Sequence, residues 1–313
     1  MNIIIYGAGA VGLGLGSFLL PSKQSLTIIA RKNTTAALQK NGLKRTGIFG
    51  GFTAKPKDFR CFSKLADVPP QIFDFILVTV KSFDSRTAAQ DIASHASLWD
   101  ANTKIILIQN GWGNAEQFTE HFPVEQVFSA RIITGFTRPK PNEVHITVHA
   151  DAMHIGSLFD QDLKSIETLA LAIGQGGFPC IPFNEIAKDL WAKMLYNCAL
   201  NPLGAILNVS YGQLAANEDT RTTMDAIIEE IYAVMDKCGY ATHWESPEDY
   251  KRVFYEKLVP ATAEHKSSTL QSLKSGKKTE IEALTGMIIT LAGQHNVDVP
   301  TNRSVYDKIK FLE

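Results

Sequence analysis

The 313-residue sequence has little of what marks several classes of protein. Its four cysteines include no C-x-x-C pair and lie near no histidine cluster, which argues against a metal site and favours buried thiols in a reducing, cytoplasmic compartment. The formal net charge is −1 without a basic tract, so nucleic acid has no electrostatic footprint to bind. No apolar run reaches the roughly 18 residues that span a membrane, and the first run lacks the basic leader of a signal peptide.

The composition that remains is typical of a globular protein, with 45% hydrophobic and 20% charged residues, and its length suits about two domains. In the first 150 residues, nearly continuous apolar runs alternate with segments long enough to form helices. This order predicts strands buried on both faces of a parallel sheet. The predicted strands are residues 2–7, 25–31, 73–81 and 104–111.

The remaining pattern divides the chain near residue 184. Residues 126–156 are predicted to be β-structure with a turn at 139–142, followed by a helix over 163–173 and a strand over 178–183. Beyond them only helical periodicity is found. It covers residues 185–201, 219–238, 247–259, 268–274, 280–295 and a last short helix. We therefore expect an α/β doubly wound parallel sheet in residues 1–184 and an all-α domain in residues 185–313.

The first apolar run leads into a glycine motif, G-x-G-x-x-G. The first glycine permits a tight turn, the second lets a pyrophosphate approach the backbone, and the third lets the next helix press on the strand. Such triplets also occur in plain turns, but this one lies between a strand and a helix, which favours a Rossmann-type domain that binds a dinucleotide. The loop comprises Gly7, Ala8, Gly9, Ala10, Val11 and Gly12, and the later Gly14 and Gly16 are interpreted as close helix packing.

The second predicted strand ends in Arg31 and Lys32. The NAD form of this fold has a carboxylate there, which holds the ribose 2′-hydroxyl. A guanidinium can instead hold a 2′-phosphate. Two exposed loop cations are the alternative explanation, but the position favours NADP(H) over NAD(H).

Two more polar residues end predicted strands, Lys81 after the third and Asn110 after the fourth. Ligands of open α/β sheets bind at the carboxyl ends of the strands, so both side chains could touch the cofactor or the substrate. Each also has a plain explanation, as a solvated lysine and as part of an Asn-Gly turn.

Residues 189–206, DLWAKMLYNCALNPLGAI, are an apolar helical segment that carries Lys193, Asn197 and Asn201 at intervals of four. That spacing places all three on one helix face. A narrow solvent face would explain it, yet asparagine is a poor helix former, and a cleft between domains would form at this helix. Amides suit the orientation of a polar ligand, and a partly desolvated lysine suits proton donation.

A partner for this lysine is expected near residue 280. Glu280 lies in the first turn of a predicted helix, where the helix dipole alone would favour a carboxylate and catalysis is the competing explanation. Thr279 and Glu282 have the spacing of a capping box. Ser268, twelve residues before Glu280, either caps a helix or binds a ligand.

Taken together, these residues resemble the ketopantoate reductase family over nearly the whole chain. The resemblance is carried by GAGAVG at Gly7, VK at Val80, QNG at Gln109, KMLYNCALNPLGAIL at Lys193, SSTLQSL at Ser267 and TEIEALTG at Thr279. The combination K-x3-N-x3-N-P with a later S-x11-E is quite specific, whereas the glycine triplet is not. The resemblance implies NADPH-dependent reduction of a small 2-oxo acid, 2-dehydropantoate, to (R)-pantoate in pantothenate and coenzyme A biosynthesis.

It also implies a role for each matching residue. Lys193 would be the general acid, and Glu280 would orient Lys193 or the substrate and contact the cofactor. Arg31 would hold the 2′-phosphate, with Lys81 and Asn110 lining the cofactor and the substrate. The substrate's hydroxyl and carboxylate would be held by Asn197, Asn201 and Ser268.

Two positions depart from the family pattern. Ser272 follows Leu270-Gln271 where the family usually has aspartate, and Tyr211 stands where asparagine is expected. Both border the predicted substrate pocket, so the identity of the 2-oxo acid stays open. A reductase of another 2-oxo acid and a non-catalytic NADP(H)-binding sensor are the alternatives. The helical domain could pack against a second copy in a homodimer or stand alone.

Overall fold

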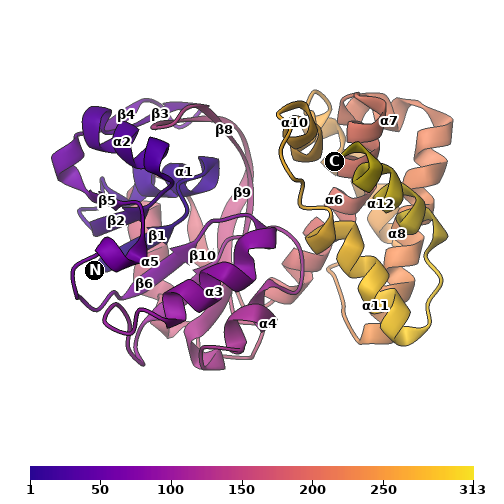
Figure 1. Ribbon diagram of the computed structural model, residues 1–313. Helices are drawn as coiled ribbons and strands as arrows, with labels where there is room; N and C mark the ends of the chain where they lie inside the picture. The colour runs from indigo at the N-terminus through magenta and orange to yellow at the C-terminus, as the bar shows by residue number, and fades with distance from the viewer. The chain divides into compact units, whose positions relative to one another are not determined.

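The computed structural model describes residues 1–313 and divides them into two compact units (Figure 1). Unit 1 comprises residues 1–109 and 114–186, and unit 2 comprises residues 110–113 and 187–313. The short segment 110–113 thus belongs with the helical part of the chain. The predicted division at residue 184 instead places residues 110–113 in the first domain.

Unit 1 is built on a ten-stranded sheet in the order β4-β3-β9-β8-β7-β6-β1-β2-β5, with β10 beside β9. The run from β5 to β8 is parallel. It comprises β5 (Arg60–Phe62), β2 (Ser25–Ile29), β1 (Asn2–Tyr6), β6 (Phe75–Val78), β7 (Lys104–Leu107) and the start of β8 (Val127–Lys140). All four strands predicted in the first part of the chain are present, and the Rossmann-type parallel sheet is confirmed.

Both faces of this sheet are covered by helices. Ile3 and Ile5 of β1 pack into a core with α1 (Ala10–Leu19) and α5 (Lys164–Gln175). Ile4, between them, packs on the opposite side with α3 (Ser85–Ala93) and α4 (Asn114–Thr119). Successive strand residues point to opposite faces, so a continuous apolar run is what a doubly covered strand requires.

A long antiparallel hairpin extends the sheet beyond its parallel part. β8 pairs with β9 (Glu143–Gly156), and the chain turns after Lys140 as predicted. The hairpin packs on α1, since a Cβ added at Gly14 would lie 2.5 Å from the Phe136 ring. Gly14 is therefore explained by close packing. The β10 strand (Cys180–Pro182) and the helix before it also lie where the sequence predicts them.

Three short strands, β3 (Leu43–Gly47), β4 (Phe52–Ala54) and β5, were not predicted. Helix α2 (Lys32–Asn41) lies in one of the segments that were predicted to be long enough to form helices. β3 is partly polar and pairs with β9, about a hundred residues away in the sequence, so no local sequence pattern predicts this strand.

Unit 2 is helical. Its helices are α6 (Ile186–Leu207), which enters the unit at residue 187, α7 (Tyr211–Ala216), α8 (Glu218–Cys238), α9 (Pro247–Val253), α10 (Ser268–Lys274), α11 (Met287–His295) and α12 (Pro300–Leu312). Helix α6 continues past Pro202 to Leu207, as expected for the apolar helical segment at 189–206 and beyond residue 201, where the helical periodicity was predicted to end. Proline removes only one N–H donor, and Leu203 and Ala205 beyond it are buried.

The capping box predicted at Thr279 and Glu282 is wrong. The Thr279 hydroxyl accepts from the backbone N–H of Ile281, two residues on, rather than from that of Glu282. The Glu282 carboxylate accepts from the Tyr306 hydroxyl at 2.9 Å and pairs with Lys310. Residues 282–286 form a π-helical turn ahead of α11, with Leu284 outside helical geometry. The predicted helix over 280–295 is thus present but kinked.

Glu313 holds this turn in place. Its carboxylate accepts from the backbone N–H of Thr279 at 2.8 Å, from the Thr279 hydroxyl at 2.5 Å and from Lys310 at 2.8 Å. Burial would raise the pKa of Glu313, but the hydrogen bonds from Lys310 and Thr279 outweigh it and lower the pKa below its ordinary value. A lowered carboxyl pKa contributes stability that is present above the ordinary pKa and is lost as the pH falls.

We expect Glu313→Gln to lower the free energy of unfolding by about 1 kcal/mol at pH 7, since it weakens charge-assisted hydrogen bonds. The difference from the unmodified protein should shrink as the pH falls below the ordinary glutamate pKa of about 4.3, where the native carboxylate also becomes protonated. Urea unfolding followed by circular dichroism at both pH values measures this. A difference that stays constant with pH would contradict the assignment.

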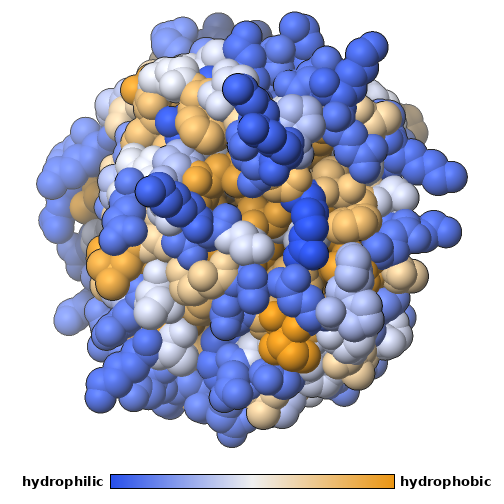
Figure 2. All heavy atoms as spheres, turned by 90° about the vertical axis from the view of Figure 1, so that its left-hand side faces the viewer, coloured by the Kyte–Doolittle hydropathy of each residue, from blue (hydrophilic) through white to orange (hydrophobic).

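Polar residues dominate the face of unit 1 that lies at the left in Figure 1, with hydrophobic residues between them in small groups (Figure 2). No helix is both long and apolar enough to cross a bilayer. No group of three or more histidine, cysteine, aspartate or glutamate side chains is arranged to hold a metal ion. All four cysteines are free, and burial raises the pKa of Cys61 to about 11 and that of Cys198 to about 12. These two thiols are therefore poor nucleophiles at neutral pH.

Candidate functional site

The glycine loop joins β1 to α1 at the carboxyl edge of the parallel strands. Gly7 has φ +114°, and a Cβ there would lie 2.9 Å from the backbone nitrogen of Val80 on the loop after β6. At Gly12 a Cβ would lie only 2.0 Å from the Gly7 carbonyl oxygen. The turn and the close approach of helix and strand predicted for these glycines are both present.

The N-terminus of α1 can accept an anion. Gly9 is its N-cap, no side chain caps the helix, and no acidic residue lies in the first turn. A Cβ added at Gly9 would meet nothing within 4 Å, so open space lies over the loop at this point. The first N–H groups of a helix carry partial positive charge and bind phosphate groups well. The loop therefore fits a dinucleotide pyrophosphate.

Substitutions at Gly12 and Gly9 should separate packing from binding. Gly12→Ala should destabilise unit 1 by about 1–3 kcal/mol, because the new methyl group collides with the Gly7 carbonyl. Gly9→Ala should leave stability nearly unchanged and weaken the binding of a dinucleotide, because its methyl group enters the open space. Thermal unfolding and calorimetric titration with NADPH measure the two effects. Equal behaviour of the two variants in both measurements would argue against this division of roles.

Arg31 lies at the same edge of the sheet as the glycine loop. It is the N-cap of α2, just beyond the end of β2, and β2 is paired in parallel with β1. Arg31 and Lys32 are both exposed, and the first turn of α2 contains no acidic residue. The start of α2 therefore lacks the carboxylate that binds the ribose 2′-hydroxyl in the NAD form of this fold.

Lys81 and Asn110 follow β6 and β7, and they belong to different units. Lys81 lies in unit 1 and is exposed. Asn110 lies in unit 2, where its side-chain amide donates to the Glu280 carboxylate at 3.5 Å. Asn110 and Glu280 are 170 positions apart in the sequence, and both were candidate site residues from the sequence alone.

The segment 110–113 is fixed on the π-helical turn at 282–286. The Trp112 N–H donates to the Ala283 carbonyl at 3.0 Å, and the Trp112 ring lies 5.1 Å from Trp191 of α6. Gly111 has φ +92° and lies so close to Ala283 that a Cβ would be 2.3 Å from its carbonyl oxygen. This contact positions Asn110 beside Glu280. Apart from its two glycines, the sequence gives no sign of it.

The three polar residues that were predicted to share one face of a helix do so on α6. Lys193, Asn197 and Asn201 all lie within the helix, the first two half-buried and Asn201 only 4% exposed. A solvent face does not account for a buried asparagine, so the plain explanation fails at Asn201. Its amide oxygen accepts from the Tyr211 hydroxyl at 2.5 Å.

Tyr211 and the start of α10 complete this region of unit 2. Tyr211 is buried, burial raises its pKa well above the ordinary value, and its hydroxyl therefore stays a neutral donor. The Tyr211 N–H donates to the His265 carbonyl at 3.1 Å. The cap of α10 is Ser267, whose hydroxyl accepts from the Leu270 N–H. Interpreting Ser268 as a helix cap is thus wrong, and its side chain is exposed.

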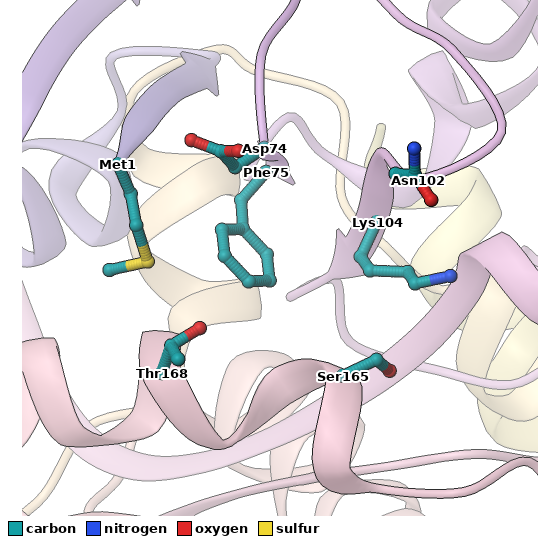
Figure 3. A pocket seen from close by; sticks show the side chains of 7 residues that line it. All are labelled: Met1, Asp74, Phe75, Asn102, Lys104, Ser165 and Thr168. Atoms are coloured by element: carbon teal, nitrogen blue, oxygen red, sulfur yellow. The ribbon is translucent and has the colours of Figure 1, made fainter.

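A pocket of about 340 Å³ lies elsewhere in unit 1, at the amino ends of β1, β6 and β7 (Figure 3). Its charged side chains already have partners. Asp74 accepts from the Asn2 N–H at 2.7 Å, and Lys104 donates to the Glu125 carbonyl at 3.0 Å. It lies at the opposite edge from the glycine loop and contains none of the candidate residues. Its lining is Met1, Asp74, Phe75, Asn102, Lys104, Ser165 and Thr168.

A mostly parallel sheet with an open glycine loop, followed in the chain by a helical unit, is typical of dinucleotide-binding proteins of two domains. Residues 3–159 match the family model for ketopantoate reductase PanE/ApbA, and residues 185–313 match the model for its C-terminal part. The chain belongs to the ketopantoate reductase family, which comprises NAD(P)-dependent oxidoreductases.

Individual relatives agree with this membership. A 2-dehydropantoate 2-reductase of Aquifex aeolicus is 37% identical over 314 residues, covering 100% of this chain and 97% of the relative. The crystal structure of a family member from Ralstonia eutropha JMP134 superimposes with a TM-score of 0.86 at 25% identity, covering 100% and 98%. A D-mandelate dehydrogenase in complex with NADH and anilino(oxo)acetate has a TM-score of 0.88 at 20% identity over 100% and 98%, which shows a shared fold.

Proposed function

We propose that this protein reduces 2-dehydropantoate to (R)-pantoate with NADPH, a step in the supply of pantothenate and coenzyme A. The full-length relative at 37% identity carries the name of that reaction. The observation that carries the proposal is the face of α6, where an ammonium group and two amides lie in one row, in the same unit as Glu280.

The cofactor is assigned to residues of the glycine loop and the strand ends. Gly7, Ala8, Gly9, Ala10, Val11 and Gly12 would hold the pyrophosphate through backbone N–H groups. Arg31 would bind the 2′-phosphate, because its guanidinium presents paired donors to phosphate oxygens. Lys81, Asn110 and Glu280 would contact the remainder of the cofactor. When bound, the reduced nicotinamide supplies the hydride.

The chain's own chemistry is proton donation and substrate orientation. Reduction of a ketone leaves negative charge on its oxygen, and the Lys193 ammonium can stabilise this charge and then protonate the oxygen. Asn197, Asn201 and Ser268 would bind the hydroxyl and carboxylate of the substrate. The amide of Asn110 donates to Glu280, which keeps that carboxylate ordered near the proposed site.

The substrate, a small 2-oxo acid, has a second candidate, a relative of ketopantoate with a different side chain. The hydrogen bond from Tyr211 to Asn201 favours this second substrate. The bond occupies the Asn201 amide oxygen, which would otherwise accept from the hydroxyl of ketopantoate. The D-mandelate dehydrogenase with the same fold is named for a different hydroxy acid.

A steady-state assay over a panel of 2-oxo acids distinguishes the two candidates. Ketopantoate should give the highest kcat/KM with NADPH. A higher kcat/KM for another 2-oxo acid would replace ketopantoate as the substrate. No NADPH oxidation with any member of the panel would favour a nucleotide-binding sensor.

We also propose that residues 1–184 form the nucleotide-binding domain and residues 185–313 the substrate domain. A cytoplasmic location accompanies this assignment, because four free thiols fit a reducing compartment.

A further inference from the structure

Arg138 connects the long hairpin to the predicted cofactor site. It lies near the end of β8, and its Nη1 donates to the carbonyl oxygen of Ala8 at 3.0 Å and to the Thr34 hydroxyl at 3.3 Å. Ala8 belongs to the glycine loop, and Thr34 lies in the first turn of α2 beyond Arg31. One guanidinium therefore contacts both the loop that would hold the pyrophosphate and the helix start that would hold the 2′-phosphate.

The charge around Arg138 is uncompensated. Burial lowers the pKa of Arg138, and the nearby positive charge of Arg31 lowers it further. Neither guanidinium forms an ion pair with a carboxylate. Two cations held near each other without a counter-ion repel, and the repulsion is relieved when an anion binds between them.

Arg138 also has N–H donors that form no hydrogen bond within the protein. A guanidinium has five N–H donors, and the two contacts to the protein both use Nη1. Nε and Nη2 have no acceptor within the protein. A residue that served only to hold the hairpin against the loop would not need this second, planar set of donors, which matches the geometry of phosphate oxygens.

We propose that Arg138 is the second guanidinium of the 2′-phosphate site and, together with Arg31, selects the phosphorylated dinucleotide. The inference rests on the proposed function, in which the cofactor is NADP(H). It assigns specificity to a residue of the hairpin, outside the glycine motif and the end of the second strand.

Binding of nucleotide fragments tests the inference without turnover. Calorimetric titrations with 2′,5′-ADP and with 5′-AMP compare the site with and without the 2′-phosphate. Arg138→Gln should weaken binding of 2′,5′-ADP by about 10- to 100-fold and leave 5′-AMP nearly unchanged. Arg138→Lys, which keeps the charge without the planar fork, should lose less, and it substitutes for the glutamine variant if that variant does not fold.

Arg60→Gln is the matched control, a half-buried arginine of unit 1 whose side chain donates to Gln71. It should leave both affinities unchanged. An equal loss for the two fragments in the Arg138 variants would make Arg138 a structural support of the glycine loop and overturn the inference. If the Arg138 variants prefer 2′,5′-ADP over 5′-AMP as strongly as the unmodified protein does, the inference is also overturned. If the unmodified protein binds both fragments equally, the choice of NADP(H) fails as well, which distinguishes the two failures.

Discussion

Lys193→Ala should lower kcat for 2-oxo acid reduction by about 10²–10⁴-fold, the range typical of a lost general acid. The affinity for NADPH should remain near normal, because the proposed cofactor contacts lie elsewhere. Stopped-flow or steady-state measurement of NADPH oxidation, together with calorimetric titration of the nucleotide, separates the two quantities.

Two further variants sharpen this prediction. Lys193→Arg keeps the positive charge, but a guanidinium does not release its proton near neutral pH, so it should restore little of the lost kcat. Lys237→Ala, an exposed lysine of α8, should behave as the unmodified protein. Full turnover by Lys193→Ala would remove Lys193 from the role of acid.

Arg31→Gln should raise the Kd for NADPH by about 10- to 100-fold, because a charge-assisted contact to the 2′-phosphate is lost. The Kd for NADH should stay nearly unchanged, since NADH has no group to contact there. Titrating both nucleotides measures the ratio directly. Lys32→Gln, at the adjacent exposed cation, serves as the control and should change the ratio less.

A stronger variant tests the same position in the opposite direction. Arg31→Asp introduces a carboxylate where the NAD form of the fold has one, so it should favour NADH over NADPH. An unchanged preference in both Arg31 variants would place the 2′-phosphate contact at another residue.

Much of unit 1 could be predicted because its central strands are buried on both faces. Ile3, Ile4 and Ile5 are all fully buried, and such a run can only be a strand or a buried helix segment. The glycines that follow then fix the turn. β3 could not be predicted, because it gains its stability from pairing with β9, a contact across about a hundred residues.

The candidate residues of unit 2 were predictable to different degrees. The row on α6 follows from spacing alone, since intervals of four share a helix face. The contact between Asn110 and Glu280 does not, because it depends on Gly111 lying against Ala283 across a large separation in sequence. The capping box failed for a related reason. Thr279 and Glu282 have the right spacing, but tertiary partners, Glu313 for one and Lys310 for the other, determine where their side chains bond.

The central proposal is that this chain uses the phosphorylated dinucleotide, NADPH, to reduce ketopantoate. The most direct test is the loss of reduced-nicotinamide absorbance when the purified protein is mixed with ketopantoate and NADPH, with NADH in a parallel reaction. Rapid oxidation of NADPH and much slower oxidation of NADH is the predicted result. Absence of oxidation with either nucleotide, or equal rates with both, would contradict it.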